Sequence, residues 1–102
     1  MFVHVVLFWV PKDAPAGAAE QIAADCKRLL SQIPTIKSIE VGKPAMTPRD
    51  VVDNSYDVGL LTVFADSAGH DVYQTHPLHL EFIARNKHAF GRVQIYDFDT
   101  AK

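Results

Sequence analysis

Residues 2–10 (Phe-Val-His-Val-Val-Leu-Phe-Trp-Val) are apolar on both of the faces that a β-strand would present. β-Branched and aromatic residues favour extended structure, and Pro11 ends the run. Residues 56–65 repeat this pattern, because successive side chains of a strand point to opposite faces and both sets are largely hydrophobic. A sheet built on such strands has one face for its own helices and a second face that needs another cover.

The other elements follow from hydrophobic periodicity and from the residues that interrupt it. An apolar stripe with spacings of three and four residues predicts a helix over residues 16–33, with Asp13 as its cap and Pro34 as its end. The remaining predicted elements are a strand over 36–43, a long connection over 44–55, a strand over 56–65, a helix over 67–74 capped by Asp66 or Ser67, a helical segment over 77–88 and a strand over 93–98.

This order of elements, β-α-β-β-α-β, is that of the ferredoxin-like α+β fold. We therefore predict a single domain over residues 1–102, in which helices cover one face of a four-stranded antiparallel sheet. A partner sheet related by a two-fold axis would cover the other face, so the chain is predicted to be a homodimer. The pattern leaves open whether the two sheets pack flat or close into an α/β barrel.

Charge and composition argue against several classes of partner. The net charge is −2 and the ten Lys and Arg residues are scattered, so there is no basic surface for nucleic acid or for an anionic membrane. Residues 2–10 are too short to span a bilayer, which takes about 20 apolar residues, and they lack the flanks of a signal peptide. The expected compartment is therefore cytoplasmic. The single Cys26 is expected to be a core residue without a disulfide.

The side chains most suited to proton transfer gather in one short run, Tyr-Gln-Thr-His-Pro-Leu-His at residues 73–79. A histidine can take and return a proton near neutral pH, and a nearby tyrosine hydroxyl can orient it or stabilise an enolate oxygen. His79 shares a helical face with Phe82 and is expected to point inward. Two interpretations stay open: His79 is an acid–base group, or it is a core histidine, with His76 only shaping a helix start.

A transition-metal site is another interpretation of this run. His76 and His79 lie three residues apart, and His70, Asp71 and Glu81 are close to them in the sequence. The proline between the two histidines disturbs helical geometry, and no cysteine pair or His-Glu-x-x-His motif supports them. No glycine-rich phosphate loop is present either. We therefore predict no metal and no cofactor.

Three features together resemble the stress-responsive dimeric A/B barrel family. They are His4 in an apolar first strand, the element order, and the His-Pro-Leu-His run of residues 76–79 with Tyr73 before it. The terminal strand, Gln-Ile-Tyr-Asp-Phe at residues 94–98, fits the family too. The resemblance implies a homodimer whose sheets join into a barrel. From the strand pattern alone, His4 is either a polar member of a cavity or a satisfied core residue.

One plant branch of this family, similar to olivetolic acid cyclase, closes a linear polyketide by an intramolecular aldol condensation. The resemblance implies that Tyr73 and His79 are the catalytic pair, and it places His4 in the pocket. Val58 stands where that branch has a pocket histidine in its third strand. No cofactor is implied, and the implied ligand is an apolar carbonyl compound. The predicted substrate-binding residues are His4, Val58, His76 and Phe82.

Three functions remain open at this point. The first is a cavity that binds an apolar carbonyl compound and cyclises or isomerises it through His79 and Tyr73. The second is a non-catalytic dimer in stress response or ligand sequestration, in which His79 is structural. The third is a cofactor-free monooxygenase, which rests on analogy with other dimeric barrels of this shape.

Overall fold

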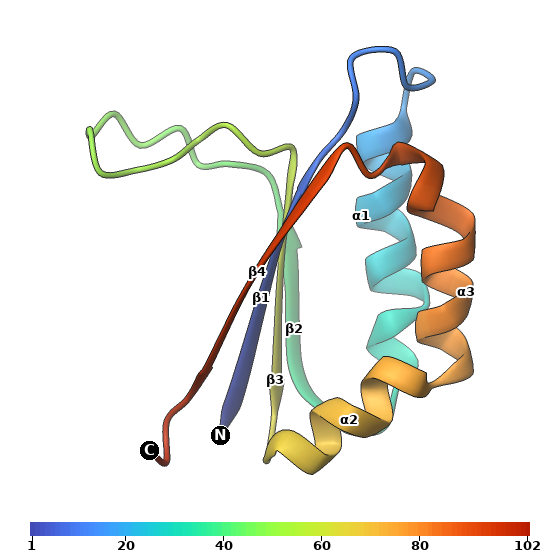
Figure 1. Ribbon diagram of the computed structural model, residues 1–102, viewed down its shortest axis with the longest axis vertical. Helices are drawn as coiled ribbons and strands as arrows, with labels where there is room; N and C mark the ends of the chain where they lie inside the picture. The colour runs from blue at the N-terminus through green and yellow to red at the C-terminus, as the bar shows by residue number, and fades with distance from the viewer.

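Four strands form one sheet, and all the helices lie on one of its faces (Figure 1). The computed structural model describes residues 1–102. The elements are β1 (Phe2–Trp9), α1 (Ala18–Arg28), β2 (Ile36–Gly42), β3 (Val58–Phe64), α2 (Ser67–Thr75), α3 (Pro77–Asn86) and β4 (Arg92–Asp99), with short 3₁₀ turns η1 (Leu30–Gln32) and η2 (Lys87–Ala89). The strand order is β2-β3-β1-β4 and every pairing is antiparallel, so the predicted α+β, ferredoxin-like arrangement is confirmed.

The two faces of β1 have different surroundings, as its alternating pattern predicts. Val6 and Phe8 face the helices and are buried in the main core together with Phe64 of β3. Burying a side chain of this size contributes about 1.5–3 kcal/mol. On the opposite face Val5 and Leu7 are only half-buried, because no helix covers them. The sheet therefore keeps an apolar face that its own chain leaves uncovered.

The first helix is shorter than predicted, and its predicted cap is wrong. α1 begins at Ala18, and its N-cap is Gly17, which has a left-handed backbone (φ 85°) and makes no capping side-chain bond. Asp13 cannot reach the helix because it lies inside a turn closed by the hydrogen bond from Ala14 N to Pro11 O. At the other end the helix stops at Arg28, and the apolar stripe continues through η1.

The break between α2 and α3 forms as predicted, and it sets the direction of both helices. Asp66 caps α2 by accepting a hydrogen bond from Gly69 N at 2.9 Å. His76 has an extended backbone, which the following Pro77 favours, and its Nδ1 accepts a hydrogen bond from Leu78 N at 3.1 Å. The side chain of His76 is therefore a helix cap, and α3 leaves α2 at an angle (Figure 1).

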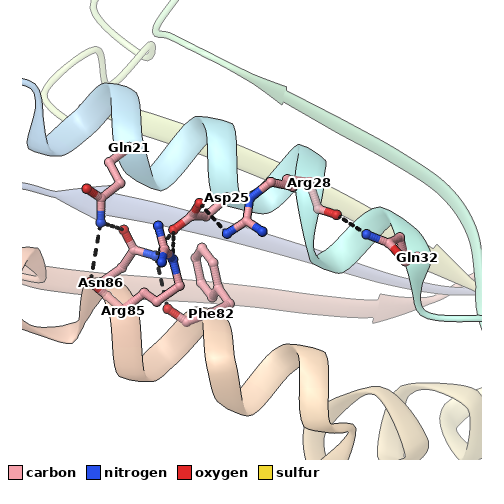
Figure 2. Close-up of polar contacts among 7 residues, drawn as sticks. All are labelled: Gln21, Asp25, Arg28, Gln32, Phe82, Arg85 and Asn86. Atoms are coloured by element: carbon pink, nitrogen blue, oxygen red, sulfur yellow. Dashed lines mark hydrogen bonds and ion pairs between the residues drawn. The ribbon is translucent and has the colours of Figure 1, made fainter.

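A buried carboxylate joins α1 to α3. Asp25 is 3% exposed and accepts hydrogen bonds from Arg85 Nε at 2.8 Å, Asn86 Nδ2 at 3.0 Å and Arg28 Nη2 at 3.2 Å (Figure 2). Gln21 extends the network by donating to Asn86 Oδ1. Because a buried carboxylate needs such donors, this cluster fixes how the two helices pack on each other.

The predicted long connection is a segment without regular structure, residues 43–57. It leaves the end of the sheet and projects on the side opposite the helices (Figure 1). Trp9 Nε1 donates to Ser55 Oγ at 3.1 Å, and Asp57 accepts from Val10 N at 2.7 Å, so the returning end of the segment is held to β1. None of the helices has the length and hydropathy needed to cross a bilayer.

Gly91 is expected to tolerate no larger residue, because it packs directly on backbone atoms. A Cβ there would lie 3.0 Å from Trp9 O and 3.1 Å from Pro11 N. We expect Gly91→Ala to lower the free energy of unfolding by about 1–2 kcal/mol, measured by urea denaturation at fixed protein concentration. Gly42→Ala is the matched control, since a Cβ at Gly42 meets no atom within 4 Å. Equal stability of the two variants would contradict the expectation.

Candidate functional site

A cavity of about 250 Å³ lies between the helix-facing side of the sheet and helices α2 and α3. Nine of its twelve lining residues are hydrophobic, and the three others are His4, Gln74 and His79. Val93 and Ile95 of β4 line it while being 41% and 47% exposed, so the cavity opens along this edge strand. A mostly apolar space with a few convergent polar groups is the usual form of a small-molecule site.

Tyr73 and His79 meet in the cavity wall. Their rings contact edge to face, with centroids 4.6 Å apart. They come from successive helices, and the cap formed by His76 brings them together, because a continuous helix would place residues six apart on different faces. A tyrosine hydroxyl is already protonated at neutral pH, and burial raises the pKa of Tyr73 further, so the hydroxyl is available as a hydrogen-bond donor.

His79 is a polar group whose bonding capacity the chain leaves unused. Its Nδ1 is buried and has no hydrogen-bond partner. Burial, and next the nearby His4 ring, lower the pKa of His79, so its imidazole is neutral at pH 7. A neutral imidazole can accept a proton, and a buried nitrogen without a hydrogen-bond partner gains from a polar ligand atom that reaches it.

His4 is held by a carboxylate from the neighbouring strand. His4 and Asp97 lie directly opposite each other on β1 and β4, and His4 Nδ1 is 2.5 Å from Asp97 Oδ1. Thr62 Oγ1 donates to the backbone oxygen of His4 at 3.2 Å. The contact with Asp97 therefore fixes the orientation of the His4 ring.

The cavity brings together four of the six predicted site residues. His4, Tyr73, His79 and Phe82 line it. Two others lie elsewhere. His76 caps α3. Val58 is buried in the core, and on the side of α1 it borders a separate pocket of about 350 Å³ together with Ala19 and Ala23.

Sequence reasoning missed the contribution of the last strand and of α2. Asp97, Val93 and Ile95 were predicted only as parts of a strand, since nothing local shows which residue of β4 faces His4. His70 was considered only as a neighbour of the His76–His79 run, yet its ring lies 4.5 Å from that of His4. Antiparallel register between the first and last strands, combined with the alternation of faces, is the signal that would have found Asp97.

Comparison with known proteins gives a consistent assignment of the fold. A stress-response A/B barrel domain-containing protein of Arabidopsis thaliana is 27% identical over 100 residues, which cover 98% of this chain and 86% of that protein. The crystal structure of a dimeric ferredoxin-like protein of unknown function from Thermobifida fusca has a TM-score of 0.78 at 21% identity, covering 95% of this chain and 88% of the other.

An enzyme is among the similar structures. The hydroxynitrile lyase of Passiflora edulis has a TM-score of 0.78 at 20% identity, covering 95% of this chain and 90% of its own. At this identity the likeness shows a shared fold. Residues 2–100 match the sequence model of the stress-responsive A/B barrel domain, which is nearly the whole chain. The chain therefore belongs to the stress-responsive A/B barrel domain family.

Proposed function

We propose that the chain works as a homodimer whose cavity binds an apolar carbonyl compound, and that His79 and Tyr73 act on this compound as base and hydrogen-bond donor. The observation that carries the proposal is the buried, unpartnered Nδ1 of His79 at a mostly apolar cavity. A buried nitrogen without a partner is costly to keep, and a polar ligand atom would satisfy it. The hydroxynitrile lyase supports the idea that this fold can hold an active site.

The homodimer is inferred from the sheet face opposite the helices. Val5, Leu7 and Leu61 are half-buried there, and Tyr96 and Phe98 of β4 are more than half exposed on the same side. A monomer would leave this patch in water. A second copy would cover it, as the dimeric state of the Thermobifida fusca protein suggests.

The proposed reaction is proton transfer at the carbon next to a carbonyl group. Neutral His79 would take the proton, and the electron pair of the C–H bond would move into an enolate. The Tyr73 hydroxyl, which its raised pKa keeps protonated, would donate a hydrogen bond to the enolate oxygen. The imidazolium of His79 would then return the proton to the product. The apolar walls would hold a flexible substrate in a reactive shape.

Ligand binding is tested first by thermal unfolding with a panel of β-keto acids, phenols and fatty acyl compounds. A ligand at about 100 times its Kd adds about 2.7 kcal/mol, which raises the Tm of a chain of this size by about 10 °C or more. We expect this shift in the wild type and its loss in His79→Ala. The matched control is His88→Ala, because His88 is exposed and does not line the cavity. Shifts that persist in His79→Ala would place the ligand elsewhere.

Catalysis is then separated from simple sequestration by proton exchange. The ligand that shifts the Tm is dissolved with the protein in D₂O, and exchange at its α-carbon is followed by NMR. Loss of a general base typically slows such a step by about 10²–10⁴-fold, so we expect His79→Ala to abolish detectable exchange and Tyr73→Phe to slow it. A ligand that binds the wild type but never exchanges would make the cavity a binding site without this activity.

A further inference from the structure

Three side chains able to bind a metal ion meet where β1, β4 and α2 come together. His4 and Asp97 are cross-strand partners, and His70 of α2 packs over them with its ring centroid 4.5 Å from that of His4. Each of the three offers one ligand atom, and these atoms all lie within 4.8 Å of one another. Such a set of two imidazoles and one carboxylate is a common protein ligand set for transition metals.

A second observation points to a ligand at this place. His70 is only 7% exposed, and its Nε2 is buried without a hydrogen-bond partner. The other ring nitrogen, Nδ1, lies 3.2 Å from the amide nitrogen Nε2 of Gln74. A half-turn of that amide places its oxygen there to accept from Nδ1–H, which leaves Nε2 with a free lone pair. Metal-binding histidines usually have such an outer hydrogen bond on the second nitrogen.

We propose that His4, His70 and Asp97 bind one divalent transition-metal ion per chain, with Zn²⁺ as the best fit. Two imidazole nitrogens favour Zn²⁺ or its neighbours over Mg²⁺ and Ca²⁺, which prefer oxygen ligands. Three protein ligands leave a fourth tetrahedral position for water or another ligand. The proposal does not rest on the acid–base activity proposed for His79, but His4 lines the cavity in which His79 lies. The sequence suggested no such site because the ligands lie up to 93 residues apart.

Small movements of side chains are enough to close the site. Zinc bonds of about 2.0–2.1 Å place tetrahedral ligand atoms about 3.3 Å apart. His4 Nδ1 and Asp97 Oδ1, at 2.5 Å, must separate by less than about 1 Å, with the metal replacing the shared proton. The Asp97 side chain is 37% exposed, so packed protein surrounds it on only part of its surface. His70 Nε2 loses no hydrogen bond when it moves inward.

The test is titration of the purified, metal-free protein with Zn²⁺ by calorimetry and with Co²⁺ by visible absorption. We expect one ion per chain and the strong d–d bands of four-coordinate Co²⁺, without a thiolate band, since Cys26 is buried and its pKa is raised to about 12. Loss of an outer hydrogen bond already weakens metal sites 10–100-fold, so removing a ligand should weaken binding at least ~100-fold. Two variants remove one ligand each, His70→Phe and Asp97→Asn.

The two variants are chosen so that a loss of metal binding can be told apart from a loss of folding. His70→Phe keeps an aromatic ring against Phe2, with which His70 stacks at 4.6 Å, and removes both nitrogens. If His70→Phe does not fold by circular dichroism, Asp97→Asn, at a partly exposed position, gives the answer alone. His88→Ala is the control and should bind like the wild type. Absence of four-coordinate Co²⁺ absorption in the wild type, or unchanged affinity in the folded variants, overturns the proposal.

Discussion

Asp25→Ala is expected to lower the free energy of unfolding by about 2–3 kcal/mol at pH 7. The carboxylate is 3% exposed and accepts three side-chain hydrogen bonds. Removing it leaves Asn86, which is 1% exposed, with only the Phe82 backbone oxygen as acceptor for its amide. The substitution also removes the side-chain hydrogen bonds by which Asp25 joins α1 to α3.

The loss should depend on pH in a defined direction. Burial alone would raise the pKa of Asp25, but hydrogen bonds from Arg85, Asn86 and Arg28 outweigh it, so the folded pKa lies below the usual value. A carboxyl with a depressed folded pKa stabilises the protein above its unfolded pKa, which is about 3.9. That contribution disappears as the pH falls through the folded pKa. The difference between wild type and Asp25→Ala should therefore shrink below about pH 4.

Urea denaturation at fixed protein concentration, at pH 7 and at several values down to pH 2, measures this difference. Arg28→Ala is the control. Its guanidinium is 54% exposed and forms an i,i+3 pair with Asp25, so its loss should cost less than about 0.5 kcal/mol. A difference between wild type and Asp25→Ala that stays constant over the whole pH range would mean that packing, and not the charge, carries the effect.

Leu61→Asp is expected to convert the proposed homodimer into monomers. Leu61 lies in β3 on the face opposite the helices, paired with Val5 of β1 and Glu40 of β2. In a dimer built on this face the new carboxylate would be buried beside another carboxylate, and its desolvation and repulsion should weaken association at least ~100-fold. Light scattering should give twice the 11.3 kDa chain mass for the wild type and the single mass for the variant.

The matched control for this substitution is Leu80→Asp. Leu80 is a 56% exposed leucine on α3, on the helix side of the sheet, so the same charge there should leave the dimer intact. The wild-type Tm should rise with protein concentration, and the Tm of Leu61→Asp should not. A wild type that is monomeric at all concentrations would remove the homodimer from the proposed function.

Local sequence signals predicted most of the fold because they act over a few residues. Alternation identified the strands, and the His76–Pro77 step separated α2 from α3. The prediction failed at the start of α1, where Asp13 has the right chemistry for a cap but is held in a turn by a backbone hydrogen bond. Which of several nearby residues begins a helix depends on that turn, and the apolar stripe does not encode it.

The site was predictable only as far as its residues are neighbours along the chain. Tyr73 and His79 lie in one short run, and helical spacing was enough to point His79 inward. Asp97 and His4 are 93 residues apart in the sequence and are brought together by the pairing of β1 with β4. No local sequence pattern specifies the register of that pairing. A histidine before proline suits both a pocket and a helix cap, and in the structure the Nδ1 of His76 accepts the capping hydrogen bond from Leu78 N.

The position of β1 in the sheet has a consequence for how the chain is made. β1 is central, and its two neighbours are β3 and the final strand β4. During synthesis on the ribosome β1 emerges first, and one of its edges stays unpaired until residues 92–99 leave the exit tunnel. That bare edge is apolar and open to neighbouring nascent chains. Chaperone demand should therefore peak just before β4 emerges, and chains stopped short of β4 should aggregate although three strands and every helix are present.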